Sequence, residues 1–356
     1  MNLISLGWTP QYAEAFGRLT GDLVPARIAV AYGATFRVYL EDGETLADVS
    51  GRMRHDAQGR RDLPAVGDWV AIKRNDQADR ATIHAILPRR SLFSRKVAGD
   101  QTAEQIIAAN VDTAFLVTGL DHDFNIRRLE RYLAVAWSSG ARPVIVLNKA
   151  DLAPDLAAQR DQVQAIAFDV PIHAVSAKAQ HGLDALEPYL QPGQTVALLG
   201  SSGVGKSTII NRLLGEDRLR TNEVRASDQR GRHTTTHREL VPLPGGALLI
   251  DTPGMRELQL WTADDGIQET FDDIEARAVD CFFKDCGHDS EPRCAVKAAV
   301  AEGTIPEDRL QSYLKLQREQ RHLEARQDAL AQQAQKRQAR AGAKALQKRI
   351  QDKGRD

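Results

Sequence analysis

The sequence contains few cysteines, no long apolar run and almost no net charge, and each of these features excludes a class of protein. Only three of its 356 residues are cysteine, which argues against a framework of disulfides. No apolar run approaches the roughly 20 residues that cross a bilayer, and the N-terminus lacks the basic start and apolar core of a signal peptide. A net charge of −1 gives no overall attraction to nucleic acid. We therefore expect a cytoplasmic protein without a membrane segment.

Charge is unevenly distributed along the chain. Residues 315–356 hold twelve Lys or Arg against five Asp or Glu, so a basic tail follows an acidic body. The last part of this tail has few apolar positions and is expected to be a solvated helix or disordered. The sequence does not indicate an oligomeric state, and a monomer is the default expectation.

Three regions with different patterns indicate a multidomain protein. Residues 1–98 hold about five short strand-like runs separated by turns, which favours a small β-barrel of the OB-fold type. Such a barrel either binds RNA or only packs against its neighbour, because fold alone does not give function. Residues 99–262 alternate apolar strands with helices such as 126–139, which predicts an α/β domain with a parallel sheet covered on both faces. Residues 263–356 are expected to be helical around the cysteines.

A phosphate-binding loop is predicted from Gly200 onward. The run GSSGVGKS fits G-x-x-x-x-G-K-[ST], follows an apolar strand and precedes a helical segment, as this motif requires. Its backbone amides and the helix N-terminus attract phosphate oxygens, Lys206 is expected to contact the β- and γ-phosphates, and Ser207 is expected to bind Mg²⁺. A glycine-rich turn without a ligand is the alternative. The predicted phosphate-site residues are Gly200, Ser201, Ser202, Gly203, Val204, Gly205, Lys206, Ser207 and Thr208.

Two later segments are candidates for sensing the γ-phosphate. The run DTPG ends an apolar strand, where Asp251 can hold Mg²⁺ through water and the Gly254 amide can contact the γ-phosphate. Residues 216–240 form a long polar segment that contains the run Thr234-Thr235-Thr236, of which we favour Thr235 as a Mg²⁺ ligand that binds only while the γ-phosphate is present. A structural turn and a flexible loop without this role are the alternatives.

The run NKAD at residues 148–151 predicts recognition of guanine. The Asp151 carboxylate can accept hydrogen bonds from the ring N–H and the exocyclic amine of guanine, and adenine lacks that amine. Asn148 is expected to brace this loop, and the stem of Lys149 can lie against the base. A later strand ends in residues that can support the base through a main-chain amide, namely Ser176, Ala177 and Lys178.

These motifs occur in a rotated order. Gly200 follows Asp151 by 49 residues, whereas most nucleotide-binding domains with both motifs carry the phosphate loop first. If the order of the strands in space is unchanged, the domain is a circularly permuted GTPase, and such cuts are tolerated where the original termini lie close together. The permutation connects the γ-phosphate sensor directly to the C-terminal domain.

The cysteines predict a structural zinc site. The spacing C-x4-C-x-H-x5-C supplies three thiolates and one imidazole, a closed tetrahedral set without the open position that a catalytic zinc needs. Free buried cysteines are the alternative. The predicted zinc ligands are Cys281, Cys286, His288 and Cys294.

Hydrolysis of GTP is expected to be slow without a partner. Many GTPases carry a glutamine directly after the Asp-x-x-Gly motif to orient the attacking water, and here that position is Met255. His233 is the best local substitute, although a loop histidine without this role is an equal alternative. The candidate catalytic residues are therefore His233, Thr235 and Lys206.

With these motifs assembled, the chain resembles the ribosome small subunit-dependent GTPase A family. NKAD, SAK, GSSGVGKST, RHTTT, DTPG and the Cys/Cys/His/Cys set carry the resemblance, which extends to about residue 315. It implies an OB-fold, a permuted GTPase domain and a zinc-binding domain, with hydrolysis stimulated by the small ribosomal subunit during its late maturation. Arg293 stands where the family usually has glycine.

Three functional hypotheses follow. In the first, the GTPase acts on the small subunit and grips rRNA through the barrel, the basic run at residues 89–96 and the tail. In the second, GTP gates binding to a protein or another RNA. The third, a permuted GTPase of the large subunit, is disfavoured by the OB-like N-terminus and the zinc set.

Overall fold

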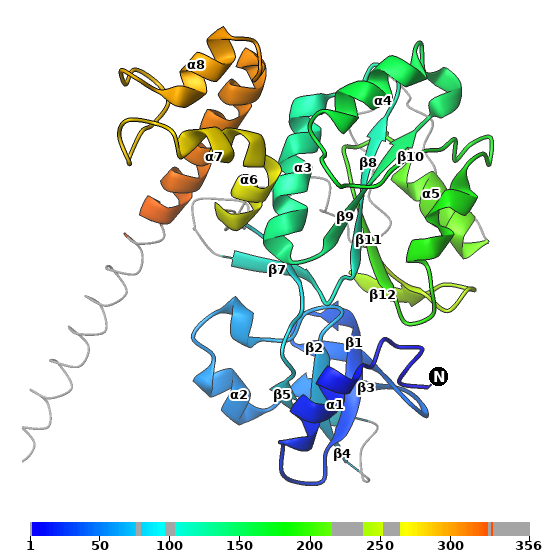
Figure 1. The fold of residues 1–356 in the computed structure, drawn as a ribbon. Coiled ribbons are helices and arrows are strands. Elements are labelled where there is room, and N and C mark those ends of the chain that lie inside the picture. The colour runs from blue at the N-terminus through cyan, green and yellow to red at the C-terminus, as the bar shows by residue number, and fades with distance from the viewer. Residues whose placement is uncertain are drawn as a thin grey trace, which may run out of the picture.

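The computed structural model describes residues 2–75, 80–96, 104–215, 238–251, 264–326 and 329. These residues form a β-barrel, a central sheet with helices on both faces, and a group of helices that packs beside helix α3 (Figure 1). No helix among them is both long and apolar enough to cross a membrane. The three-part architecture predicted from the sequence is confirmed.

The N-terminal part is a closed five-stranded barrel. Its strands are β1 (Val24–Tyr32), β2 (Thr35–Leu40), β3 (Gly43–Val49), β4 (Trp69–Arg74) and β5 (Arg80–Ile86). The barrel closes because β1 pairs with both β2 and β4. Trp69 is fully buried inside it and packs edge-on against Trp8 at a ring separation of 4.6 Å. Short helices flank the strands, namely α1 (Pro10–Gly17), α2 (Gly51–Asp56) and η1 (Arg60–Asp62).

A hairpin of β6 (Leu92–Lys96) and β7 (Glu104–Ala109) connects the barrel to the central sheet. The predicted domain boundary between residues 98 and 99 falls between its strands, and the boundaries at 98 and 262 remain predictions.

Two arginines of the basic run at residues 89–96 make contacts inside the protein. Arg89 forms an ion pair of 2.7 Å with the buried Asp68, and Arg90 forms one of 2.8 Å with Asp112. These two side chains therefore help to hold the fold together, and the predicted contact of the basic run with RNA remains a prediction.

The central sheet has the strand order β10-β9-β8-β11-β13-β12. Its strands are β8 (Thr113–Gly119), β9 (Arg142–Asn148), β10 (Ile172–Ala174), β11 (Thr195–Leu199), β12 (Glu239–Pro242) and β13 (Leu248–Asp251). All pairings are parallel except that of β12 with β13. The chain enters this sheet at β8, yet the strand that leads to the phosphate loop, β11, lies directly beside it. The parallel sheet expected from the apolar runs is confirmed.

Alternate residues of the strands face two different cores. Leu116 and Leu147 belong to the core that includes helix α3, whereas Val117 and Val146 belong to the core that includes helix α5. Helices therefore cover both faces, as nearly continuous apolar strands require. The helices of this part are α3 (Ile126–Ser139), η2 (Ala150–Leu152), α4 (Leu156–Gln164), η3 (Leu183–Tyr189) and α5 (Lys206–Leu214). The predicted helix 126–139 is observed with those bounds, and Gly140 ends it at a φ of 81°.

The barrel and the central sheet share one hydrogen-bonded sheet. Strand β12 pairs with β13 on one side and with β1 of the barrel on the other, with Val30 opposite Glu239. The Tyr39 hydroxyl also donates to the Leu240 carbonyl at 3.3 Å. The prediction of a loop over residues 216–240 is therefore wrong at its C-terminal end, because β12 begins at Glu239. Residues 216–237 lie outside the described ranges.

The C-terminal helices pack against α3. They are α6 (Asp264–Thr270), α7 (Asp272–Ala278), α8 (Ala295–Ala301) and a helix over residues 307–326. At Gly266, a Cβ atom would overlap the Ala134 carbonyl and the Ser138 side chain, so the glycine allows α6 to approach α3 closely. Arg309 donates to the buried Glu130 at 2.9 Å and joins the last helix to α3. Residues 315–326 of the predicted basic tail belong to this last helix, and the rest of the tail, apart from residue 329, lies outside the described residues.

Candidate functional site

The predicted nucleotide-binding motifs gather at one edge of the central sheet. The phosphate loop follows β11, the NKAD run begins at the last residue of β9, and the DTPG run begins at the last residue of β13. Because these strands run parallel, their carboxyl ends lie at the same edge, where α/β sheets bind their ligands.

Asn148 joins three segments of this edge. Its side chain is buried, and its Nδ2 donates to the Val204 carbonyl of the phosphate loop at 2.7 Å. Its Oδ1 accepts from the Ala177 amide at 3.0 Å. Both ends of one amide side chain are thus used to hold the phosphate loop and the SAK segment around the NKAD loop, which is the bracing contact that the sequence predicts.

The phosphate loop has a shape that only glycine permits at two positions. Gly200 adopts a φ of 157°, and a Cβ there would overlap the Val117 carbonyl. Gly205 adopts a φ of 98°, and a Cβ there would overlap the Asn148 side-chain nitrogen. The loop therefore presses directly against β8 and the NKAD loop, and Val204 is completely buried between them.

Helix α5 starts at the end of this loop, as a phosphate site requires. Lys206 is its first residue, and the Lys206 ammonium group donates to the Gly200 carbonyl at 2.6 Å and to the Ser201 carbonyl. Ser207 and Thr208 occupy the first turn and are partly exposed. The buried Ile209 and Ile210 anchor the helix, so its N-terminal amides and hydroxyls are held at the edge where phosphate and Mg²⁺ are expected.

The base loop turns sharply at Lys149. This residue has a left-handed φ of 62°, and its ammonium group forms an ion pair of 2.6 Å with Asp121. Asp151 and Lys178 are exposed, and no described residue donates a hydrogen bond to the Asp151 carboxylate. Ser176 is buried beneath them. The Asp151 carboxylate is thus accessible to the two guanine donors that it is predicted to bind.

Two carboxylates at this edge were missed by the sequence analysis. Asp121 and Asp123 follow β8 and contact the base loop and the phosphate loop respectively, through Lys149 and Ser201. Their place directly after the predicted strand 111–120 is the signal that could have identified them, since the phosphate loop and the NKAD and DTPG runs also come at strand ends.

Part of the predicted site lies outside the described residues. The candidate switch and catalytic residues His233, Thr235 and Gly254 are in this group, as is the side chain of Asp251. Their predicted roles remain predictions.

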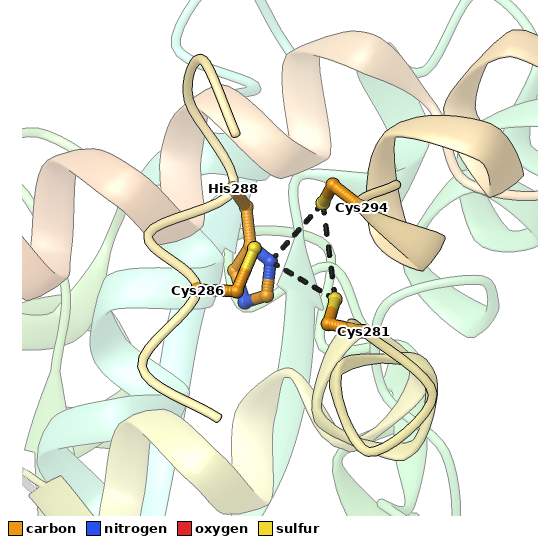
Figure 2. A group of neighbouring side chains, drawn as sticks. All are labelled: Cys281, Cys286, His288 and Cys294. Carbon is orange, nitrogen blue, oxygen red and sulfur yellow. Dashed lines mark hydrogen bonds between the residues drawn. The ribbon is translucent and has the colours of Figure 1, made fainter. Parts of the chain in front are cut away.

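The four predicted zinc ligands form one cluster (Figure 2). Their ligand atoms all lie within 4.8 Å of one another. The Cys281 and Cys294 sulfurs are 3.9 Å apart, and His288 Nδ1 lies 3.7 Å and 3.4 Å from them. A tetrahedral zinc with Zn–S bonds of about 2.3 Å places sulfurs about 3.8 Å apart. The cluster therefore fits a structural zinc ion with Nδ1 as the histidine ligand.

The surroundings shift the pKa values of two ligands toward the forms that bind metal, whereas burial raises the pKa of the Cys286 thiol to about 11. Burial lowers the pKa of His288, which favours the neutral imidazole that zinc requires. Burial raises the pKa of the Cys281 thiol, but hydrogen bonds, first those from the backbone at Val296 and Ala295, together lower it by more. The net shift of this pKa is therefore downward. Cys294 caps helix α8, with its sulfur accepting from the Lys297 amide at 3.4 Å.

Arg293 in the zinc loop has a backbone conformation that suits glycine. Arg293 adopts a left-handed φ of 57°, the conformation that a glycine adopts without strain. Its guanidinium group lies over the exposed Phe282 ring at 5.0 Å. The loop thus keeps a glycine-like backbone, with a cation–π contact beside it.

Comparison with known proteins agrees with this geometry. The RsgA GTPase family matches residues 86–261. The small ribosomal subunit biogenesis GTPase RsgA of Opitutus terrae is 49% identical over 346 residues, which cover 94% of this chain and 94% of that protein. The protein of the same name from Syntrophotalea carbinolica is 44% identical, over 95% of this chain and 94% of its own.

Two solved structures share the architecture. YjeQ from Thermotoga maritima has a TM-score of 0.61 and 26% identity, covering 84% of this chain and 99% of its own. YloQ, described as a circularly permuted GTPase, has a TM-score of 0.59 and 25% identity, covering 87% of this chain and 98% of its own. The resemblance inferred from the motifs is confirmed, and the chain belongs to the RsgA GTPase family.

Proposed function

We propose that this protein hydrolyses GTP during late maturation of the small ribosomal subunit, and that contact with the subunit stimulates hydrolysis. The observation that carries the GTPase assignment is the Asn148 side chain, which holds the base loop and the phosphate loop at one sheet edge. A nucleotide bound there is gripped at both ends. The names of the relatives from Opitutus terrae and Syntrophotalea carbinolica support the choice of partner.

The guanine end of the site is assigned to the base loop. Asp151 accepts hydrogen bonds from the two guanine donors, the stem of Lys149 lies against the base plane, and Asn148 holds the loop in place. A backbone amide of the SAK segment supports the base. The residues proposed for this end are Asn148, Lys149, Asp151, Ser176, Ala177 and Lys178.

The phosphate end is assigned to residues 200–208, with Lys206 on the β- and γ-phosphates. The hydroxyls of Ser207 and Thr235 and the carboxylate of Asp251 are hard oxygen donors of the kind that Mg²⁺ prefers. Bound Mg²⁺ neutralises charge on the phosphates. The Gly254 amide contacts the γ-phosphate. We assign the orientation of the attacking water to His233, because Met255 cannot perform this role.

We further propose that the partner surface includes rRNA and that the protein acts as a cytoplasmic monomer. The OB-like barrel and the basic residues 315–356 support binding to RNA, whose phosphates attract lysine and arginine. A salt-dependent affinity for the small subunit is the expected consequence.

Turnover of GTP, with ATP as the control nucleotide, tests the proposal. It is measured for the protein alone and with each purified ribosomal subunit. We expect slow hydrolysis of GTP alone, strong stimulation by the small subunit and none by the large one. Stimulation by the large subunit, or equal turnover of ATP, would contradict the proposal. GTP binding without stimulation by either subunit would favour a GTP-gated module with another partner.

A further inference from the structure

A loop outside the predicted motifs contacts both nucleotide-binding loops. It comprises residues 121–125, between β8 and α3, and we call it the β8–α3 loop. Its two carboxylates, Asp121 and Asp123, lie beside segments built for a triphosphate. Unpaired negative charges there would repel a nucleotide. The role of each carboxylate therefore depends on the groups that it contacts.

Asp121 holds the base loop. Its Oδ2 accepts from the Lys149 ammonium group at 2.6 Å, and its Oδ1 accepts from the Asp123 amide at 3.1 Å. Burial raises the pKa of this carboxyl, but the hydrogen bonds from Lys149 and from the Asp123 amide together lower it by more, so the net shift is downward. Gly119 leaves the space that this contact needs, because a Cβ there would lie 2.7 Å from Asp121 Oδ1.

Asp123 holds the phosphate loop. Its Oδ2 accepts a short hydrogen bond from the Ser201 hydroxyl, and its Oδ1 accepts from Arg128 at 2.9 Å. Arg128 lies in the first turn of α3, which Asn125 caps by accepting from the Arg128 amide at 2.9 Å. The carboxylate is therefore fixed by a helix on one side and holds a glycine-rich loop on the other.

The two residues are also joined to each other, since the Asp121 carboxylate accepts from the Asp123 backbone amide. A continuous path thus runs from Lys149 through Asp121 and Asp123 to Ser201. It is independent of the Asn148 contact, which reaches the phosphate loop at Val204. Hydrogen bonds to ionised groups are roughly twice as strong as neutral ones. Loops ordered before binding lose less entropy when the ligand arrives.

We propose that Asp121 and Asp123 are positioning residues for the nucleotide, with Asp123 holding the phosphate loop through Ser201 and Asp121 holding the base loop through Lys149. The inference rests on the proposed function in that the ligand of these loops is a guanine nucleotide. The β8–α3 loop is in this way a further, charged connection between the two ends of the site.

Equilibrium binding and release of fluorescent mant-GDP in the presence of Mg²⁺ test the phosphate-loop arm with the full-length chain. We expect Asp123→Ala and Ser201→Ala each to weaken binding about tenfold, as the loss of one charge-assisted hydrogen bond predicts. Because both changes break the same contact, the double variant should bind no more weakly than Asp123→Ala. A merely structural role of Asp123 would not give this non-additivity.

Asp42→Ala is the matched control. Asp42 pairs with Arg74 on the exposed barrel surface, much as Asp123 pairs with Arg128, but it contacts neither nucleotide loop. We expect it to leave mant-GDP binding unchanged. Effects of Asp123→Ala and Ser201→Ala that multiply in the double variant, or binding that stays unchanged in both, would overturn the assignment. If Asp123→Ala does not fold, mant-GDP binding by Ser201→Ala tests the assignment, because this change removes a single oxygen atom. Unchanged binding would then overturn the assignment.

The base-loop arm is tested with Asp121→Asn, which keeps the shape of the side chain and removes its charge. We expect mant-GDP to dissociate about tenfold faster, and the effect of Asp121→Asn to be much smaller in a Lys149→Ala background, where the contact is already lost. An unchanged dissociation rate overturns this arm. These assays contain no ribosomal subunit. A wild-type protein that binds mant-GDP but is not stimulated by the small subunit would therefore overturn the proposed function and leave this inference standing.

Discussion

At the scale of single residues, Arg293 shows how a side chain can occupy a position that suits glycine. A left-handed conformation costs a residue with a Cβ roughly 1–2 kcal/mol, and Arg293 has a φ of 57°. An exposed cation–π contact, such as that between Arg293 and Phe282, contributes about 0.5–1 kcal/mol. The contact therefore offsets part of the backbone strain in the zinc loop, and the two effects can be separated by substitution.

We expect Arg293→Gly to be about 1 kcal/mol more stable than Arg293→Ala in the zinc-loaded protein. Both variants lose the contact with Phe282, but only alanine keeps the strain of the left-handed backbone. Urea unfolding followed by circular dichroism measures the difference, with the zinc content of both proteins matched. Equal stabilities of the two variants would show that the backbone at this position is not strained.

The role proposed for His233 can be isolated from nucleotide binding. We expect His233→Ala to bind GTP normally and to lose hydrolysis stimulated by the small subunit by about 100-fold or more, the usual effect of losing a group that acts on the attacking water. Single-turnover hydrolysis and mant-GTP binding give the two quantities separately. His55→Ala serves as the control, because this exposed histidine lies in α2 of the barrel and contacts neither nucleotide loop. Unchanged stimulated turnover in His233→Ala would remove the histidine from the mechanism.

At the scale of elements, local patterns predicted the parts of the site that depend on neighbouring residues in sequence. The phosphate loop, the NKAD loop and helix 126–139 have their own patterns of glycine, polar residues and apolar spacing. The four-residue strand β12 and the β6–β7 hairpin do not. The hairpin strands β6 and β7 pair with each other, whereas β12 exists because the distant strand β1 pairs with it. The contact between Asp121 and Lys149 could not be predicted from the sequence pattern, because 28 residues separate them along the chain.

Helix α3 is the element that carries the C-terminal helices, and Gly266 controls this packing. A Cβ at Gly266 would overlap the Ala134 carbonyl, which is backbone and cannot move aside cheaply. We expect Gly266→Ala to destabilise the protein by about 1–3 kcal/mol through overpacking, with GDP binding preserved. Gly17→Ala is the matched control, because a Cβ there meets nothing within 4 Å. Thermal unfolding compares the two variants, and equal melting temperatures would contradict the close packing of α6 on α3.

At the scale of the whole molecule, one apolar core extends through all three parts. It includes Ile28 of the barrel, Leu116 of the central sheet and Phe271 of the C-terminal helices. Strand β12 adds a hydrogen-bonded connection between the barrel and the central sheet. These shared contacts predict that the parts unfold together, so that GDP, which binds at the sheet edge, stabilises the barrel as well.

Arg27 is a buried residue that connects these parts by hydrogen bonds. Its guanidinium group donates to the carbonyls of Leu6, Gly67 and Asn110 and to the Thr195 hydroxyl at the start of β11. Burial lowers the pKa of Arg27 to about 10, which leaves it charged at neutral pH. One fully buried cation thus hydrogen-bonds to the N-terminal segment, the barrel and the central sheet at the same time.

We expect Arg27→Met to destabilise the protein by on the order of 3 kcal/mol or more, because it leaves several buried carbonyls without a donor. The barrel should then melt separately, and GDP should raise only the transition of the central sheet. Differential scanning calorimetry with and without GDP resolves these transitions. Arg74→Met, which breaks an exposed ion pair inside the barrel, should shift stability by less than about 1 kcal/mol and keep one transition. A single transition in Arg27→Met that GDP shifts as a whole would mean that β12 and the shared core couple the barrel to the nucleotide site without Arg27.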